Sequence, residues 1–270
     1  MPRPFLKWVG GKGQLVGQLI ERTPAQFGAY HEPFMGGGAF FFALYRAQRI
    51  RTAFLSDINT ELVDAYTAVR DETEAVIERL AKFRHTEKFF YTQRKRNPWR
   101  MIRPNRAARM IFLNKTCYNG LYRVNSKGQF NAPFGRYKNP KFRDVENLHA
   151  VAKALTNVSL QNESFNIVLE NTRPGDFVYF DPPYVPLSVT ANFTSYHRDG
   201  FGYDEQVRLR NVACELDQRG VHVMLSNSAT EVVRDLYGSH FNIEQVLARR
   251  AINSDPNKRG KLSEFLITNY

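Results

Sequence analysis

The chain has 270 residues, 43% of them hydrophobic and 13% aromatic, and this composition excludes disorder over its whole length. The formal net charge of +12 attracts polyanions, which indicates nucleic acid or an anionic membrane as a partner. No apolar run approaches the roughly 20 residues that cross a bilayer, and residues 1–15 lack the apolar core of a signal peptide.

The first zone of the chain, residues 1–60, has the order expected of a βαβ unit. A helix is predicted over residues 14–22. A short run then leads into HEPFMGGGAFFFAL, where the glycines precede a second helix, and TAFLSD follows as a strand. This succession indicates an open parallel sheet.

The middle zone, residues 61–144, differs in character. Helical spacing is present at its start, at Leu62, Tyr66, Val69, Val76, Ile77, Leu80 and Phe83. Beyond these positions the chain becomes strongly basic and aromatic, and the basic residues from Arg94 to Arg109 are expected to contact phosphates. Asn119-Gly120 and a later Lys-Gly pair mark tight turns between short candidate strands, so this part is predicted as loop and hairpin rather than core.

The last zone, residues 145–270, returns to alternating helices and strands. FVYF, HVMLSN and FLITNY are three buried strand candidates. We expect the first and last zones to share one sheet, which gives an α/β fold. The chain has two cysteines, Cys117 and Cys214, without CxxC spacing, and its histidines lack metal-ligand spacing. These features favour a reducing cytoplasm and nucleic acid as partner, with no metal site.

Two strand ends in the first zone carry signals for a nucleotide-like ligand. Glycines in the stretch from Glu32 to Gly38 allow backbone to approach a ligand, and the helix that follows favours negative charge at its N-terminus. Asp57 lies about 20 residues further on, where an acid commonly binds ribose hydroxyls. Because GGKGQ is a poor match to a phosphate-binding P-loop, an adenosyl ligand without a triphosphate fits better.

A third strand end, in VYFDPPYVPLS, predicts the chemistry. Asp181 stands where a buried strand ends, and Pro182 and Pro183 contribute carbonyls without N–H groups. Such acceptors can bind both hydrogens of an exocyclic amino group while Tyr184 offers a face on which a purine stacks. Acceptors on both hydrogens localise the nitrogen lone pair, which can then attack an electrophilic methyl group. A plain turn is the alternative for the isolated tetrapeptide.

Seven stretches occur in one order along the chain: FLKWVGGK, EPFMGGGAFFFAL, SDINTEL, YNGLYRVNSKGQFNAPFGRYK, GDFVYFDPPYVPLS, VMLSNS and RGKLSEFLITNY. Together they resemble the Dam-type DNA adenine N6-methyltransferases, most closely members that methylate adenine in GATC. The resemblance implies a Rossmann-like S-adenosylmethionine-dependent methyltransferase sheet formed by residues 1–60 and 145–270. It also implies an inserted helical and hairpin target recognition domain at residues 61–144.

The resemblance further implies roles for individual residues. The catalytic residues would be Asp181, Pro182, Pro183 and Tyr184. The positions that contact S-adenosylmethionine would be Trp8, Gly10, Lys12, Glu32, Pro33, Phe34, Gly36, Gly38, Asp57, Phe165 and Asp181. Lys7 would lie near the target base, and other contacts to double-stranded DNA would come from Asn119, Leu121, Arg123, Pro133 and Tyr137.

Two alternatives stay open on the sequence. A methyltransferase of RNA or of a protein amide could use a similar tetrad, because any planar amino group with two hydrogens satisfies the same geometry. A non-enzymatic DNA-binding protein could keep the fold. The basic insertion from Asn114 to Lys138 favours duplex DNA over the first, and Asp57, Asp181 and the glycine loop argue against the second. No membrane contact and no obligate protein partner is inferred.

Overall fold

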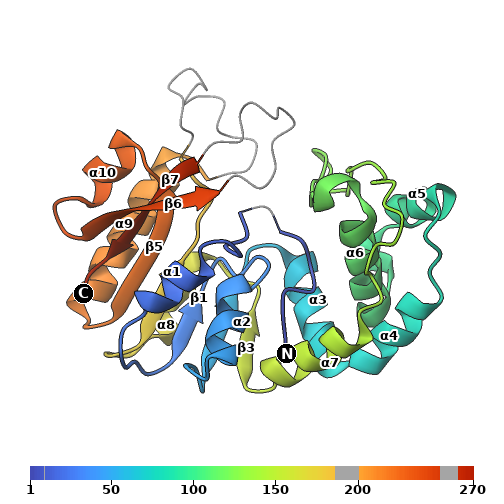
Figure 1. Ribbon diagram of the computed structural model, residues 1–270, viewed down its shortest axis with the longest axis horizontal. Helices are drawn as coiled ribbons and strands as arrows, with labels where there is room; N and C mark the ends of the chain where they lie inside the picture. The colour runs from blue at the N-terminus through green and yellow to red at the C-terminus, as the bar shows by residue number, and fades with distance from the viewer. Residues whose placement is uncertain (9, 186–200, 250–260) are drawn as a thin grey trace. The chain divides into compact units, whose positions relative to one another are not determined.

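The computed structural model describes residues 1–8, 10–185, 201–249 and 261–270 (Figure 1). These residues form two compact units. Unit 1 comprises Met1–Gly13, Met35–Arg51 and Asp57–Asn162, and unit 2 comprises Gln14–Phe34, Thr52–Ser56 and Glu163–Tyr270.

Unit 2 contains most of the strands. Its elements are α1 (Val16–Glu21), β1 (Tyr30–Glu32), β2 (Ala53–Ser56), η3 (Phe165–Ile167), α8 (Val168–Asn171), β4 (Phe177–Phe180), α9 (Tyr203–Gln218), β5 (His222–Ser228), α10 (Glu231–Tyr237), β6 (Asn242–Arg249) and β7 (Lys261–Thr268). The predicted helix at 14–22 and strands at TAFLSD, FVYF, HVMLSN and FLITNY are confirmed as α1, β2, β4, β5 and β7. The sequence did not predict β6.

The strand order of the sheet is β3-β2-β1-β4-β5-β7-β6, with β3 at Val158–Gln161. β1 pairs in parallel with β2 and β4, and β4 pairs in parallel with β5, whereas β7 runs antiparallel to β5 and β6. The predicted α/β, Rossmann-like class is therefore confirmed. Because β1 and β4 are parallel neighbours, the residues that follow them emerge at the same edge of the sheet.

The core of unit 2 surrounds β4. All four of its residues are fully buried, as expected for a near-continuous apolar run inside a parallel sheet. Leu209 and Leu216 of α9 belong to the same hydrophobic cluster as Val178 and Val223. Figure 1 shows α9 beside β5, against which it packs. The loop after β4 thus starts from a rigid, fully packed strand.

Unit 1 is mainly helical. Its elements are α2 (Ala39–Arg46), α3 (Thr60–Asp71), α4 (Thr73–Ala81), α5 (Glu87–Lys95), η1 (Pro98–Arg100), α6 (Arg103–Thr116), η2 (Tyr118–Gly120), α7 (Val145–Leu155) and β3. The helical spacing at the start of the middle zone is confirmed by α3 and α4. In Figure 1, α6 lies among α3, α4 and α5, and it packs against all three.

The prediction that the basic, aromatic part of the middle zone is not a core was wrong for α6. Most residues of α6 are buried, among them Ala108, Ile111 and Phe112. Arginines that alternate with these positions obscured the helical period, since a buried arginine counts as polar in any hydropathy pattern. Pro104 in the first turn was the available signal, because proline favours the start of a helix.

The predicted hairpin follows α6. Asn119 and Gly120 both have positive φ, 55° and 65°, which confirms a tight turn there. Val124 and Phe130 form an isolated antiparallel bridge around the predicted Lys-Gly turn. Short bridges therefore take the place of the expected short strands.

Candidate active site

In unit 1 the glycine loop lies directly against Trp8. Gly36 has a φ of +44°, and a Cβ atom added there would lie 2.7 Å from Cδ1 of Trp8. Its N–H donates to Oδ2 of Asp57 at 3.1 Å, while Oδ1 of Asp57 accepts from Asn59 N–H at 2.9 Å. Gly38, with φ of +64°, precedes α2. Only glycine allows this close approach of the loop backbone to the tryptophan ring.

Asp57 is a carboxylate held by backbone donors in a partly buried place. Burial raises the pKa of the Asp57 carboxyl above its ordinary value, and the N–H groups of Asn59 and Gly36 act in the opposite direction. A carboxylate has about four acceptor positions, so two backbone bonds are compatible with further bonds to ligand hydroxyls. The arrangement fits the ribose-binding role that the sequence predicts for Asp57.

Trp8 stacks on Tyr122, with ring centroids 5.1 Å apart and planes at 24°. The Tyr122 hydroxyl donates to Glu61 at 3.3 Å. Lys12 is largely buried, and its Nζ donates to the Gly10 carbonyl at 3.0 Å. The sequence did not predict a role for Tyr122, although it stands between two expected DNA contacts. Trp8 is thus held by a residue of the hairpin that follows α6.

In unit 2 the charges of three carboxylates act on the hydroxyl of Tyr179. Burial holds the pKa of Tyr179 well above its ordinary value, and Asp181, Glu32 and Glu264 raise it further through their charges. The Tyr179 hydroxyl shares a hydrogen bond of 2.8 Å with Ser226. We refer to Glu32, Asp181 and Glu264 as the carboxylate cluster. Such a group of acids suits a positively charged ligand such as a sulfonium or an ammonium group.

Tyrosine hydroxyls fix two members of the carboxylate cluster. Glu32, which ends β1 and is buried, accepts from Tyr30 at 2.8 Å. Glu264 of β7 accepts from the hydroxyl of Tyr184 at 2.6 Å. The sequence did not predict Glu264, because its position on an antiparallel strand beside the tetrad depends on the sheet order.

The tetrad, Asp181 to Tyr184, follows β4 directly. Asp181 and Tyr184 are partly buried, Pro182 is buried and Pro183 is exposed. The Pro183 carbonyl accepts from Nε2 of Gln206 at 2.9 Å. Of the two proline carbonyls that the sequence offers as acceptors, that of Pro183 is therefore already engaged by the protein.

Aromatic rings line the beginning of the glycine loop in unit 2. Phe34 stacks on Phe165, with centroids 5.5 Å apart and planes at 25°, and meets Phe201 edge to face at 5.6 Å. Phe165 is buried, and the guanidinium of Arg208 lies 4.9 Å from its ring centroid. Pro33, which directly precedes Phe34, is buried. An apolar, flat-sided surface of this kind fits an adenine ring.

The expected DNA contacts all lie in unit 1. Nζ of Lys7 is 4.4 Å from the ring centroid of Tyr137, a cation–π contact. A Cβ atom at Gly120 would lie 2.3 Å from Cδ of Lys7, so the turn that contains Asn119 packs closely on this lysine. Lys7, Asn119 and Tyr137 are thereby brought together by the hairpin.

The remaining hairpin positions are exposed or half-buried. Arg123 is exposed, and its guanidinium donates to the side-chain and main-chain oxygens of Asn131 at 2.7 and 3.3 Å. Leu121 is half-buried, and the exposed Pro133 accepts from Tyr118 N–H at 2.8 Å. Arg123 is therefore available at the surface but oriented by Asn131.

The expected phosphate contacts from Arg94 to Arg109 need correction at one end. Arg109 is 2% exposed and forms an ion pair of 2.8 Å with Glu61. Arg106 pairs with Asp64 at 2.7 Å. Arg109 is thus part of the protein core and is not a phosphate contact, because its side chain is enclosed.

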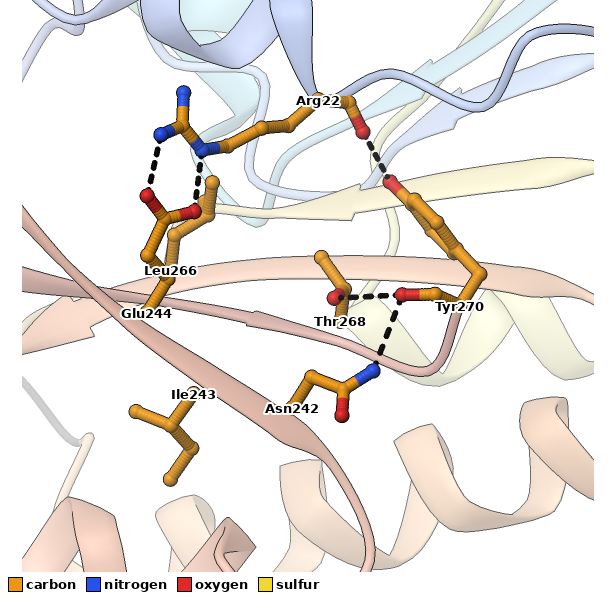
Figure 2. Close-up of a pocket in the computed structure, with 7 residues that line it drawn as sticks. All are labelled: Arg22, Asn242, Ile243, Glu244, Leu266, Thr268 and Tyr270. Atoms are coloured by element: carbon orange, nitrogen blue, oxygen red, sulfur yellow. Dashed lines mark hydrogen bonds and ion pairs between the residues drawn. The ribbon is translucent and has the colours of Figure 1, made fainter.

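Figure 2 shows a pocket of unit 2 that contains none of the predicted site residues. Its volume is about 340 Å³, and it is lined by Arg22, Asn242, Ile243, Glu244, Leu266, Thr268 and Tyr270. Its polar groups bind one another: Arg22 pairs with Glu244 and its carbonyl accepts from the Tyr270 hydroxyl. The predicted chemistry lies elsewhere in the unit.

Several sequence motifs extend beyond the described residues. Val9, Pro186 to Ser188, Arg259 and Gly260 belong to stretches that carry the resemblance and lie outside the residues that the structure describes. Among the described residues, no helix is long and apolar enough to cross a membrane. In the same part of the chain, no group of three or more His, Cys, Asp or Glu is arranged to hold a metal ion.

An α/β sheet with a close-packed glycine loop, a backbone-held acid after β2 and a carboxylate cluster around the end of β4 defines the class of S-adenosylmethionine-dependent methyltransferases. Residues 8–252 match the model of the family described as D12 class N6 adenine-specific DNA methyltransferase. The chain belongs to this family and is an adenine-specific DNA methyltransferase that uses S-adenosylmethionine.

Curated relatives agree with this assignment. The chain is 42% identical to the type II methyltransferase M1.LlaDCHI of Lactococcus lactis over 99% of its own length and 95% of the relative. It is 43% identical to the type II methyltransferase M.MjaIII of Methanocaldococcus jannaschii, over 99% of each chain. It is 35% identical to a DNA adenine methylase of Escherichia coli, over 98% of this chain and 94% of the relative.

Proposed function

We propose that this enzyme methylates N6 of the adenine in GATC after that adenine has left the DNA duplex. The observation that carries the proposal is the position of Asp181, which directly follows the buried strand β4 and belongs to the carboxylate cluster. Extrusion of the base costs a few kcal/mol, because N6 is otherwise paired and inside the stack. GATC rests on the resemblance of the seven sequence stretches.

The tetrad provides the groups that this reaction needs at the target base. Asp181 and the Pro182 carbonyl accept the two amino hydrogens, which localises the lone pair on N6. Tyr184 stacks on the extruded base, and its bond to Glu264 fixes the orientation of its ring. When bound, S-adenosylmethionine supplies an electrophilic methyl group. Catalysis by these residues is positioning and electrostatics, without a covalent enzyme intermediate.

The residues that the resemblance assigns to S-adenosylmethionine carry the proposed cofactor contacts. Asp57 binds the ribose hydroxyls, Phe165 lines the adenine, and Trp8, Gly10 and Lys12 with the Glu32 to Gly38 loop hold the methionine portion. The close packing of Gly36 on Trp8 supports this assignment, because it fixes the loop backbone against the tryptophan, and so do the acids that act on Tyr179, which suit a sulfonium.

The DNA is bound by the proposed recognition domain, residues 61–144, together with Lys7. Arg123 is the residue type that reads guanine O6 and N7 with two bonds, and Leu121 enters the base stack. Asn119, Pro133 and Tyr137 complete the contact surface. The net charge of +12 supports binding to duplex DNA, and the absence of CxxC spacing supports a cytoplasmic location.

The test uses two duplexes that differ only in carrying GATC or the same bases scrambled. Each is incubated with wild-type protein and S-adenosylmethionine labelled in its methyl group, and the nucleosides are then separated. We expect label in N6-methyladenine from the first duplex alone. Equal label in both would refute GATC, and no label in either, with the cofactor bound, would refute duplex DNA containing GATC as substrate.

A further inference from the structure

Two buried amide side chains lie beneath the tetrad in unit 2. Gln206, in the first turn of α9, is 1% exposed, and Asn227, near the end of β5, is 0% exposed. Nδ2 of Asn227 donates to Oε1 of Gln206 at 3.1 Å. Asn227 lies in VMLSNS, one of the seven stretches that carry the resemblance, but the sequence assigns no role to either residue. Buried amides are kept only where their donors and acceptors are satisfied, so their other partners are informative.

These other partners are the two peptide groups on either side of Tyr184. Nε2 of Gln206 donates to the Pro183 carbonyl at 2.9 Å, and Oδ1 of Asn227 accepts from Val185 N–H at 3.2 Å. A closed ring of hydrogen bonds therefore runs from Pro183 through both amides to Val185. We refer to Gln206 and Asn227 as the amide pair.

The chemistry of the backbone fixes the direction of every bond in this ring. A carbonyl can only accept, so Gln206 must present its nitrogen to Pro183. A backbone N–H can only donate, so Asn227 must present its oxygen to Val185. The two remaining amide atoms are then one donor and one acceptor, facing each other. Two amides satisfy the ring completely, whereas an ionised carboxylate at either position would place two acceptors face to face.

The tetrad needs such support because of its prolines. Pro182 and Pro183 have no N–H, so the protein cannot hold these two residues by their own backbone donors and binds the Pro183 carbonyl instead. The amide pair holds the backbone on both sides of Tyr184, and Glu264 holds the tyrosine hydroxyl. The plane of the Tyr184 side chain, which would stack on the target base, is thereby fixed at three points.

We propose that Gln206 and Asn227 are positioning residues of the methyl transfer, which orient the tetrad by binding the Pro183 carbonyl and the Val185 N–H. This inference rests on the proposed function of the tetrad. It gives the Pro183 carbonyl a structural partner in Gln206, while the acceptors proposed at the adenine amino group remain Asp181 and the Pro182 carbonyl.

The test compares Gln206→Leu and Gln206→Glu with wild-type protein in single-turnover methyl transfer to a GATC duplex. For Gln206→Leu we expect a rate about 10²-fold lower, the cost of a small misplacement of reacting groups. The KM values for DNA and cofactor should stay close to those of the wild type, because the amide pair contacts neither. A rate within twofold of wild type would overturn the inference, as would a change confined to KM.

Gln206→Glu supplies the readout that a purely structural role would not move. When protonated, the introduced carboxyl can donate to the Pro183 carbonyl and accept from Asn227, which restores the ring. Burial raises the pKa of such a carboxyl, so lower pH favours the protonated form. We expect the rate relative to wild type to rise as the pH falls. A Gln206→Glu rate that stays at one constant fraction, well below the wild-type rate, at every pH would contradict the inference. This pH series does not use Gln206→Leu, so it gives an answer even if Gln206→Leu fails to fold.

Asn269→Ala is the matched control. Asn269 also bonds α9 and β5, through Asp217, Val221 and Val223, but at the end of these elements away from the tetrad. It should lower the melting temperature without lowering the single-turnover rate at a temperature where the protein is folded. Methyl transfer by the wild-type protein to the same duplex tests the proposed function separately. Failure of the proposed function can therefore be distinguished from failure of the positioning role of Gln206 and Asn227.

Discussion

Arg109 is expected to stabilise unit 1 and to make no contact with DNA. Its guanidinium is 2% exposed and donates to Glu61 at 2.8 Å. It also donates to the carbonyls of Gln93 and Arg94, at 2.9 and 3.2 Å. Every side of the cation is therefore engaged by the protein, although the surrounding sequence is one of its most basic stretches.

Arg109→Met leaves Glu61 buried without its cation. Removal of one partner of a buried ion pair costs about 3–5 kcal/mol. At roughly 2–4 °C for each kcal/mol, the melting temperature should fall by about 6–20 °C. Burial raises the pKa of Glu61, and the charge of Arg109 opposes this, so loss of Arg109 raises that pKa further. The folded variant then takes up protons more readily than the unfolded chain. The loss of stability of Arg109→Met relative to wild type should therefore become smaller as the pH falls.

The assay combines thermal unfolding with DNA binding at several salt concentrations, measured where the variant is folded. A lost phosphate contact lowers the slope of log K against log salt by about 0.9. We expect the slope of Arg109→Met to equal that of wild type. The exposed Arg100, in η1, gives the matched control Arg100→Met, whose stability should change by less than about 0.5 kcal/mol. A wild-type melting temperature together with a reduced slope for Arg109→Met would refute this account.

Three further changes test other parts of the site. Arg123→Ala should lose roughly 1–3 kcal/mol of discrimination at one guanine, measured as kcat/KM on cognate and altered duplexes; unchanged discrimination would remove Arg123 from base reading. Tyr122→Ala should weaken S-adenosylmethionine binding by up to about tenfold through loss of the Trp8 stack, whereas Tyr122→Phe should not, and equal losses in titrations of both would contradict this role of the stack. Burial, and to a smaller extent the charge of Lys7, lowers the pKa of Lys115 from its ordinary value of 10.5 to about 8. Between these two pH values the unfolded chain therefore binds more protons than the folded protein. The stability of the wild type should accordingly rise over this pH range relative to that of Lys115→Met. If the melting temperatures of the two proteins change in parallel with pH, the lowered pKa of Lys115 is excluded.

The strand ends could be predicted from the sequence because their signals are local. FVYF is a continuous apolar run with the bounds of β4, so Asp181 could be placed at a strand end. Gly36 and Asp57 could likewise be placed after β1 and β2. The assigned roles of these residues stay predictions, since they depend on bound cofactor and DNA.

The helix α6 and the amide pair could not be predicted, for different physical reasons. In α6, Arg109 is buried with a partner 48 residues away, and no local pattern separates such an arginine from an exposed one. Gln206 and Asn227 act on the tetrad through α9 and β5, so their proximity depends on how these elements pack. Glu264 depends on the antiparallel insertion of β7 between β5 and β6.

The most direct test of the central claim is single-turnover methyl transfer by wild type and Asp181→Ala on the same GATC duplex, read as N6-methyladenine after nucleoside separation. DNA affinity is measured in parallel at one salt concentration. The account predicts N6-methyladenine from wild type, none from Asp181→Ala, and largely unchanged DNA affinity, because phosphate contacts dominate binding. Transfer by Asp181→Ala at the wild-type rate would contradict it.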